Sequence, residues 1–400
     1  MNIQPRLLAA SAIAILGVLL SPLIQPAWLF SILVITFSAV LFMIRGTQYI
    51  SLALGATAVL YGVGLLPLVA FSATIAIVSL GELAHRGGGC NREDYIYYTA
   101  GASTGALFVM VYLGNIQPLV LIIGVLVALL LRSIMVGRDD AYMIIMLGVA
   151  MTIALFIELD FQVDILLLIL AATTAILFGY LSFRIGAADL SGLFSGALIG
   201  ILLIVFADVR WFLVMLAFFI IGSASTRYRY GQKLAMGVEQ ERGGARGYMN
   251  AFSNGLVGTG AAVLFGLSGG DPVYAALFVG SIATATADTV ASEIGVTGGR
   301  PYLITTFQRV PEGTNGGVTV RGECAACAGS AIVAGIAYGL SIITFPVFLI
   351  CILAGFIGTN IDSVVGATLE TRGTVGNAGT NLLATLGGGT CAALLVLLFL

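Results

Sequence analysis

The 400-residue chain carries only 17 basic and 19 acidic residues, and 59% of its residues are hydrophobic. Soluble domains have about 25% charged residues, so a charged fraction of 9% excludes a soluble enzyme, a disordered protein and a secreted disulfide scaffold. The net charge of −2 provides no basic field that would attract nucleic acid. We therefore expect an all-α polytopic transmembrane helical bundle, with the lipid bilayer as its first partner.

Apolar segments of spanning length follow one another along the whole chain. A spanning helix needs about 20 apolar residues, and the breaks at charges, prolines and glycine clusters predict thirteen to fifteen spans. Their centres lie near residues 16, 35, 58, 75, 105, 124, 150, 172, 199, 217, 258, 281, 333, 353 and 390. The 52 glycines favour a bundle in which the helices approach one another closely.

The basic residues predict the orientation, because Lys and Arg concentrate on the cytoplasmic side of a membrane. With a cytoplasmic N-terminus and alternating spans, every basic residue except Arg210 falls on the cytoplasmic side. Three long loops then face the cytoplasm, over residues 224–249, 290–323 and 363–378. The membrane itself is a plasma or an organellar membrane.

The pattern of polar residues divides the chain into two domains. Residues 1–165 consist of spans joined by short turns, with few polar groups inside the membrane, and we interpret them as an N-terminal transmembrane extension of unknown role. In residues 166–400 polar side chains enter the helices. The second domain is therefore where we expect any chemistry, on the cytoplasmic face.

The first long loop is basic, with positive charges at Arg227, Arg229, Lys233, Arg242 and Arg246. One interpretation is an anchor against anionic lipid, and the other is recruitment of a phosphate ligand. The sequence before Lys233 does not match a P-loop.

Asparagine pairs begin two of the helices expected in the second domain. Asn250 and Asn254 are four residues apart and share a helix face, and Asn377 and Asn381 repeat that spacing on the last helix. These side chains either bond neighbouring helices to each other or bind a ligand.

The densest polar pattern lies on the helix expected around residue 281. One face carries Ser281, Thr284, Asp288, Ser292 and Gly295. A carboxylate at membrane depth costs at least ~2.5–3.5 kcal/mol on insertion scales, so Asp288 indicates a functional site. The alternative is a position at the cytoplasmic water line, capped by hydroxyl groups. Glu293 is about 140° away on a continuous helix, so it reaches the same ion only if the helix ends or unwinds.

The loop that follows contains the run Gly313, Thr314, Asn315, Gly316 and Gly317. Such a run exposes successive backbone N–H groups, which form a nest for phosphate oxygens.

Two arginines and one further carboxylate complete the pattern. Arg300 and Arg309 flank the nest with bidentate phosphate donors. Asp362 lies in a segment, residues 359–366, that is similar to the segment around Asp288, which hints at an internal repeat.

Three stretches, residues 287–295, 301–319 and 362–369, resemble the polytopic membrane family known as domain of unknown function 92. The resemblance covers about residues 166–400 and extends to the blocks at 191–198 and 250–255. The family includes plant phytyl phosphate kinase. The resemblance therefore implies a phosphotransferase that makes a prenyl diphosphate from a phytyl- or geranylgeranyl-type prenyl phosphate, with CTP as phosphate donor and Mg²⁺ as cofactor.

The following roles are our hypothesis within that resemblance. Asp288, with Glu293 or Asp362, would hold Mg²⁺, and these three carboxylates are the candidate catalytic residues. The 313–317 nest, Arg300 and Arg309 would bind the nucleotide phosphates, and Asn254 and Asn381 the prenyl phosphate. Two alternatives remain: a lipid cytidylyltransferase that uses CTP, and a secondary transporter.

Overall fold

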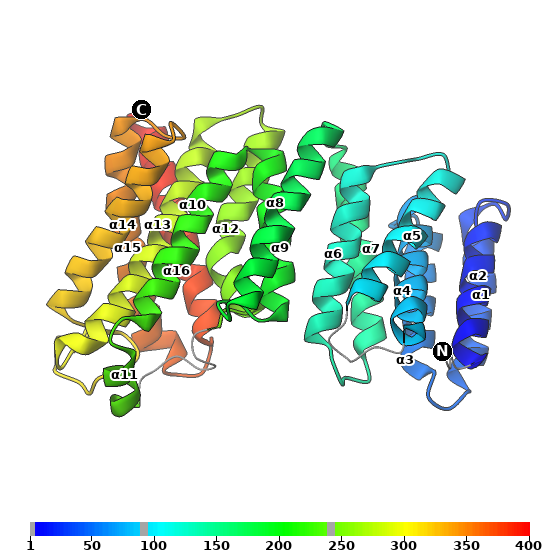
Figure 1. Cartoon of the computed structure of the whole chain (residues 1–400), viewed down its shortest axis with the longest axis horizontal. Helices are drawn as coiled ribbons and strands as arrows, with labels where there is room; N and C mark the ends of the chain where they lie inside the picture. The colour runs from blue at the N-terminus through cyan, green and yellow to red at the C-terminus, as the bar shows by residue number, and fades with distance from the viewer. Residues whose placement is uncertain (1–4, 89–94, 238–244) are drawn as a thin grey trace. The chain divides into compact units, whose positions relative to one another are not determined.

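The computed structural model describes residues 5–88, 95–237 and 245–400, which are almost entirely helical (Figure 1). This part of the chain contains 16 α-helices, of which eight are long and apolar enough to cross a membrane. The all-α polytopic fold is therefore confirmed. Each of the predicted centres falls within a helix, and the additional helix, α11 (Tyr230–Met236), lies in the basic loop. The number of spans and the side of the N-terminus stay predictions.

The chain forms two compact units, Met1–Ile165 and Leu166–Leu400. The helices of the first unit are α1 (Pro5–Leu20), α2 (Ala27–Phe42), α3 (Gln48–Gly62), α4 (Leu68–Gly87), α5 (Ile96–Tyr112), α6 (Pro118–Ile134) and α7 (Ala141–Leu159). Its buried centre is α4, which packs closely on α5 because Gly101 and Gly105 have no side chain to separate the two backbones.

A buried cluster of charges crosses the first unit, although its sequence suggested few polar groups inside the membrane. Glu82 on α4 is 3% exposed and pairs with Arg132 on α6 at 2.7 Å and with Arg86 at 3.1 Å. Tyr142 on α7 donates a hydrogen bond of 3.2 Å to the same carboxylate. The carboxylate thus links three helices, which compensates for its burial.

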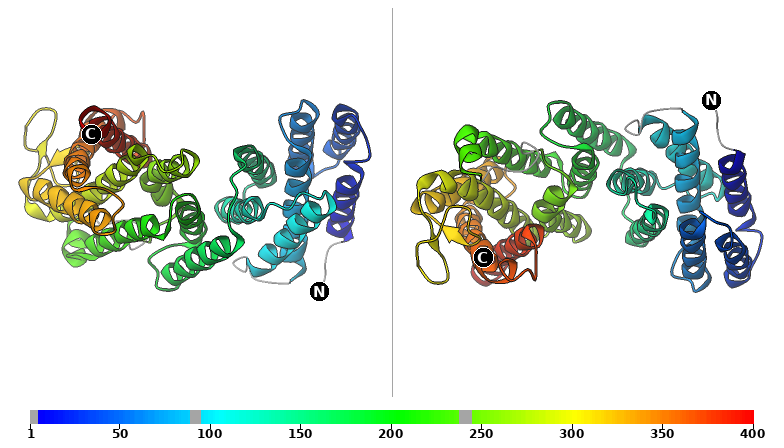
Figure 2. Two further views of the ribbon diagram at one scale, coloured as in Figure 1. Left: turned by 90° about the horizontal axis from the view of Figure 1, so that it is seen from above. Right: turned by 90° about the horizontal axis from the view of Figure 1, so that it is seen from below.

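The second unit contains the rest of the helices and one hairpin. Its helices are α8 (Ile165–Arg184), α9 (Leu190–Phe206), α10 (Val209–Arg227), α11, α12 (Tyr248–Leu267), α13 (Pro272–Gly295), α14 (Val320–Gly339), α15 (Phe345–Val365) and α16 (Asn377–Phe399). In both views of Figure 2 the small yellow hairpin, formed by strands β1 (Tyr302–Leu303) and β2 (Gly317–Val318), lies beside these helices.

The centre of the second unit is α13, which contacts α10, α12, α14, α15 and α16. Neighbouring helices approach it at glycines, as the glycine content predicted. A Cβ atom added to Gly358 on α15 or to Gly388 on α16 would overlap Thr284 of α13. The hydroxyls of Ser281 and Thr284 donate hydrogen bonds to carbonyls of their own helix, so the N-terminal part of the polar face serves helix packing.

The two loops that follow α13 and α15 contain short regular elements, and they lie with α11 at the same end of the second unit (Figure 1). A 3₁₀ turn, η2 (Val296–Gly298), extends α13, and the hairpin follows it. After α15 the chain continues as a π-helical turn, η3 (Gly366–Glu370). Short π-helical segments are rare in proteins, and those that occur are often found at functional sites. These elements bring distant polar residues to one end of the bundle.

Candidate functional site

An acidic cavity of about 380 Å³ lies where α13 and α15 end and α14 and α16 begin. Its acidic lining residues are Asp288, Glu293, Glu312, Glu323, Asp362 and Glu370. No Lys or Arg lines this cavity in the described part of the chain. A hollow with this excess of negative charge attracts cations, and it admits a polyphosphate only together with them.

The innermost feature of the acidic cavity is a pair of carboxyl groups from two helices. Asp288 of α13 and Asp362 of α15 lie close enough to interact directly, and Glu370 is near enough to act on both electrostatically. Within the described residues, Asp362 Oδ1 is buried without a hydrogen-bond partner. Two carboxyls at such close range must share a proton or a cation, since their charges otherwise repel.

This pair fits a magnesium ion that is completed by other ligands. Mg²⁺ is typically held by one or two carboxylates together with water and substrate phosphates. Among the residues that the structure describes, no three His, Cys, Asp or Glu side chains form a metal-binding group by themselves. Asp288 and Asp362, with the unpartnered Oδ1 atom, therefore suit an ion that arrives with a phosphate ligand better than a resident structural metal.

The glycine-rich run 313–317 forms one wall of the acidic cavity, where the hairpin meets η3. The N–H groups of Thr314 and Gly317 donate to Pro311 and Thr314 carbonyls. Those of Asn315 and Gly316 have no hydrogen-bond acceptor within the described residues. These two residues therefore offer candidate backbone donors for an anion in a cavity whose side chains are acidic.

Gly316 fixes the distance between this wall and the carboxyl pair. Its φ is +74°, and an added Cβ would lie 2.5 Å from both Ala367 Cβ and the Ser363 carbonyl oxygen. We expect Gly316→Ala to push the loop away from η3. The rate of the reaction in the acidic cavity should fall at least about tenfold, and the free energy of unfolding by more than ~1–2 kcal/mol. Gly186→Ala is the control, because its φ is +70° and nothing lies within 4 Å. Equal losses of activity in the two variants would contradict this role of Gly316.

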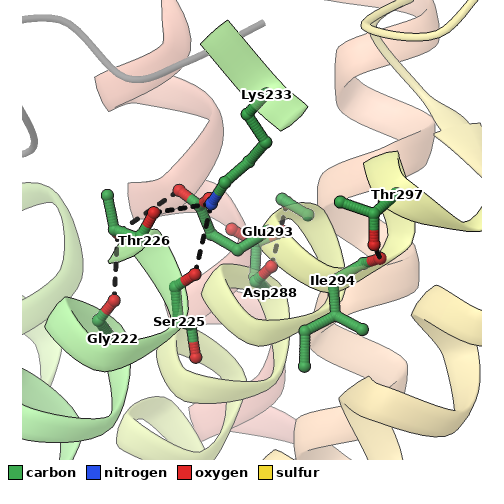
Figure 3. Close-up of polar contacts among 9 residues, drawn as sticks. Gly222, Ser225, Thr226, Lys233, Asp288, Glu293, Ile294 and Thr297 are labelled. Atoms are coloured by element: carbon green, nitrogen blue, oxygen red, sulfur yellow. Dashed lines mark hydrogen bonds and ion pairs between the residues drawn. The ribbon is translucent and has the colours of Figure 1, made fainter. Parts of the chain in front are cut away.

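Glu293 does not join the carboxyl pair, although it contributes to the lining of the acidic cavity. Its carboxylate pairs with Lys233 of α11 at 2.5 Å and accepts a hydrogen bond of 3.3 Å from the Thr226 hydroxyl (Figure 3). The exposed fractions of the Lys233 and Glu293 side chains are 2% and 6%. The helix does not unwind between Asp288 and Glu293, so the structure directs the two carboxylates to different partners. A magnesium-ligand role for Glu293 stays a prediction, and the contacts of this structure favour the pair with Lys233 instead.

The predicted arginine clamps are not at the acidic cavity. Arg300 is exposed and does not line it. Arg309 is also exposed, and its guanidinium lies 5.5 Å from the centre of the Tyr302 ring. Sequence spacing cannot orient exposed side chains of this kind, and the predicted phosphate contacts of Arg300 and Arg309 stay predictions.

The two asparagines that were expected to hold the prenyl phosphate also lie outside the acidic cavity. Asn254 is 2% exposed and donates to the Asn250 carbonyl and the Ser253 hydroxyl within α12. Asn381 is half-buried on α16, whereas Asn377, one turn earlier, lines the cavity. The structure therefore gives Asn254 a role inside its own helix.

Sequence reasoning missed Glu370, the third carboxylate of the innermost group. The spanning pattern ends near residue 363 and predicts a loop at Glu370, but η3 continues the helix and keeps Glu370 near enough to Asp362 to act on it electrostatically. Thr380, in the first turn of α16, donates a hydrogen bond of 3.1 Å to Glu370 Oε2. The spacing of eight residues between Asp362 and Glu370 is the one signal that pointed to a shared face.

The sequence profile of the family described as "Integral membrane protein DUF92" matches residues 173–390. The chain belongs to this family. The matched range contains the carboxyl pair, the hairpin and Glu370, and it lies entirely in the second unit. The DUF92 family thus accounts for the acidic cavity but not for the first unit.

Relatives occur in bacteria, archaea and plants. The chain is 39% identical over 174 residues to the uncharacterized membrane protein sll0875 of Synechocystis, and the aligned region covers 42% of this chain and 67% of the relative. It is 32% identical over 212 residues to the uncharacterized membrane protein MJ0933 of Methanocaldococcus jannaschii, and this alignment covers 52% of this chain and 85% of the relative. It is 36% identical over 166 residues to the chloroplastic protein VTE6 of Arabidopsis thaliana, and this alignment covers 40% of this chain and 50% of the relative. No solved structure matches the chain.

Proposed function

We propose that the chain is a prenyl phosphate kinase, which transfers the γ-phosphate of CTP to a membrane-embedded prenyl monophosphate in the acidic cavity. The observation that carries the proposal is that Asp288 and Asp362 line one cavity with Asn315 and Gly316, whose N–H groups have no acceptor within the described residues. The prenyl substrate and CTP come from the family resemblance.

The reaction needs positioning and neutralisation of charge more than covalent help from the protein. An oxygen of the prenyl monophosphate attacks the γ-phosphorus of CTP. The bond from that phosphorus to the bridging oxygen breaks, and CDP leaves with the electron pair, so that a prenyl diphosphate forms. The attacking oxygen is already anionic, and no general base is required. Asp288 and Asp362 would hold Mg²⁺, which supplies neutralisation of the triphosphate charge.

The acidic lining makes the dependence on a divalent cation absolute in this proposal. A triphosphate entering among six carboxylates meets repulsion unless cations enter with it. The N–H groups of Asn315 and Gly316 provide the protein's own attraction for a phosphate oxygen.

Product analysis tests this function directly. The purified full chain in detergent, given CTP, Mg²⁺ and geranylgeranyl monophosphate, is expected to form geranylgeranyl diphosphate and CDP in equal amounts. Omission of the divalent cation should abolish both products. Release of pyrophosphate in place of CDP would identify a lipid cytidylyltransferase and overturn the kinase.

A secondary transporter is the alternative to an enzyme for this carboxyl pair. Asp288 lies seven residues before the last residue of α13, a rise of roughly 10 Å from the end of the helix. Transporters place their coupling sites near the middle of the bilayer. Cation-driven uptake into vesicles, without turnover of any nucleoside triphosphate, would establish the transporter instead.

A further inference from the structure

A second cavity of about 70 Å³ lies between α8, α9, α10 and α12 of the second unit, and it is mainly apolar. Aromatic rings from α8 and α10 form much of its wall, among them Phe178, Phe212 and Phe218. The opposite wall is α9, whose glycines 192, 196 and 200 all face the cavity. We call this cavity the aromatic crevice.

One end of the aromatic crevice is closed by a buried cation, Arg246. The residue is 6% exposed, and its guanidinium lies 5.2 Å and 5.9 Å from the ring centres of Phe218 and Phe219. Its Nη1 donates a hydrogen bond of 3.1 Å to Asn250 Oδ1, the one acceptor for this guanidinium in the described part of the chain. Arginine has five N–H donors, so most of its hydrogen-bonding capacity is left for an anion.

The position of Arg246 is fixed by its backbone. Its N–H group donates to the Ala187 carbonyl at 3.0 Å, and its carbonyl accepts from the Asp189 N–H group at 3.2 Å. Burial lowers the pKa of Arg246 to about 10, so the side chain is still protonated at neutral pH. A charged, preorganised donor at the end of an apolar crevice is suited to the head of an anionic amphiphile.

The aromatic crevice is joined electrostatically to the acidic cavity. The Glu293 carboxylate, which contributes to the lining of the acidic cavity, lies near enough to the Arg246 guanidinium to stabilise its charge. Glu293 thus interacts with residues of both regions, since it lines the acidic cavity and acts on the cation that lines the crevice. An anion bound by Arg246 would therefore lie on the side of the bundle where Glu293 connects to the acidic cavity.

We propose that the aromatic crevice is the binding site of the prenyl monophosphate, with the phosphate on Arg246 and Asn250 and the first isoprenoid unit between the aromatic rings and α9. This inference rests on the proposed function. The small volume of the crevice holds one narrow chain rather than the two chains of a phospholipid. Gly196 of α9 leaves open space, and the remainder of the chain would extend into the bilayer.

Gly196→Phe tests whether the space is used. Gly196 lines the aromatic crevice and nothing lies within 4 Å of a Cβ atom built there, so a side chain at this position begins in open space and a phenyl ring would compete with a ligand for the crevice. Gly260→Phe is the matched control, because Gly260 is exposed on α12, has equally free space and lines neither cavity. We expect Gly196→Phe to weaken binding of radiolabelled geranylgeranyl monophosphate to the purified full chain at least about tenfold, and Gly260→Phe to bind as the wild type does.

Arg246→Gln tests the recognition of the head group. The wild type should prefer geranylgeranyl monophosphate to geranylgeraniol, and the variant should bind both equally well, a change that a merely structural role would not produce. Unchanged binding in Gly196→Phe, or equal competition by the two-chain phosphomonoester phosphatidate, would overturn the proposal.

The two proposals can fail separately. Binding that depends on Gly196 without any turnover in the wild type would overturn the kinase and support the aromatic crevice. Turnover with unchanged kinetics in Gly196→Phe would overturn the crevice alone.

Discussion

Replacing Asp362 by Asn is expected to lower the turnover of CTP and prenyl monophosphate by about 10³-fold, while the protein becomes more stable. The loss corresponds to several kcal/mol of electrostatic stabilisation by a bound cation. Stability should rise because an amide next to Asp288 donates a hydrogen bond, where two carboxyls repel each other unless they share a proton or a cation. Loss of activity with a gain in stability is typical of a site in which function maintains a strained arrangement.

The measurements are CDP formation and thermal unfolding of Asp362→Asn and the wild type, each with and without Mg²⁺. Mg²⁺ together with a CTP analogue should raise the melting temperature of the wild type and not that of the variant, since a ligand stabilises only a protein that binds it. Asp271→Asn is the control, because Asp271 caps the opposite end of α13 by accepting from the Val273 N–H group, and asparagine caps equally well. Full activity in Asp362→Asn would remove the carboxyl pair from the mechanism.

The helices of this protein are predictable from sequence because the signal for each is local. A run of about 20 apolar residues has to form its backbone hydrogen bonds internally when it crosses a membrane, and the structure has a helix at each predicted position. Asp288 is found for a related reason, since a carboxylate within an apolar run is costly without a partner.

The partners of the charged residues are not local and could not be read from the sequence. Lys233 and Arg246 belong to a loop that suggested a surface anchor, yet both are buried against residues far along the chain or on other helices. Arg242 of the same loop lies outside the described residues. Glu370 was missed because a π-helical turn, which no hydrophobic period announces, continues the helix after Asp362.

The pair of Lys233 and Glu293 leads to the second large effect, on stability. Lys233 Nζ donates to the Ser225 and Thr226 carbonyls at 3.2 Å and 2.6 Å as well as to Glu293 (Figure 3). Glu293→Gln leaves a buried ammonium group without its counter-charge, which costs about 3–5 kcal/mol. We expect a corresponding decrease in the free energy of unfolding.

The double variant Lys233→Met with Glu293→Gln should recover most of that loss, because replacement of a whole buried ion pair is often neutral or stabilising. Unfolding in denaturant, followed for both single variants and the double variant, gives the coupling energy between the two side chains. If Glu293 were instead a magnesium ligand, Glu293→Gln would lose Mg²⁺-dependent turnover at unchanged stability, and Lys233→Met would not restore it. The cycle therefore decides whether Glu293 secures α11 against the bundle or holds the ion with Asp288.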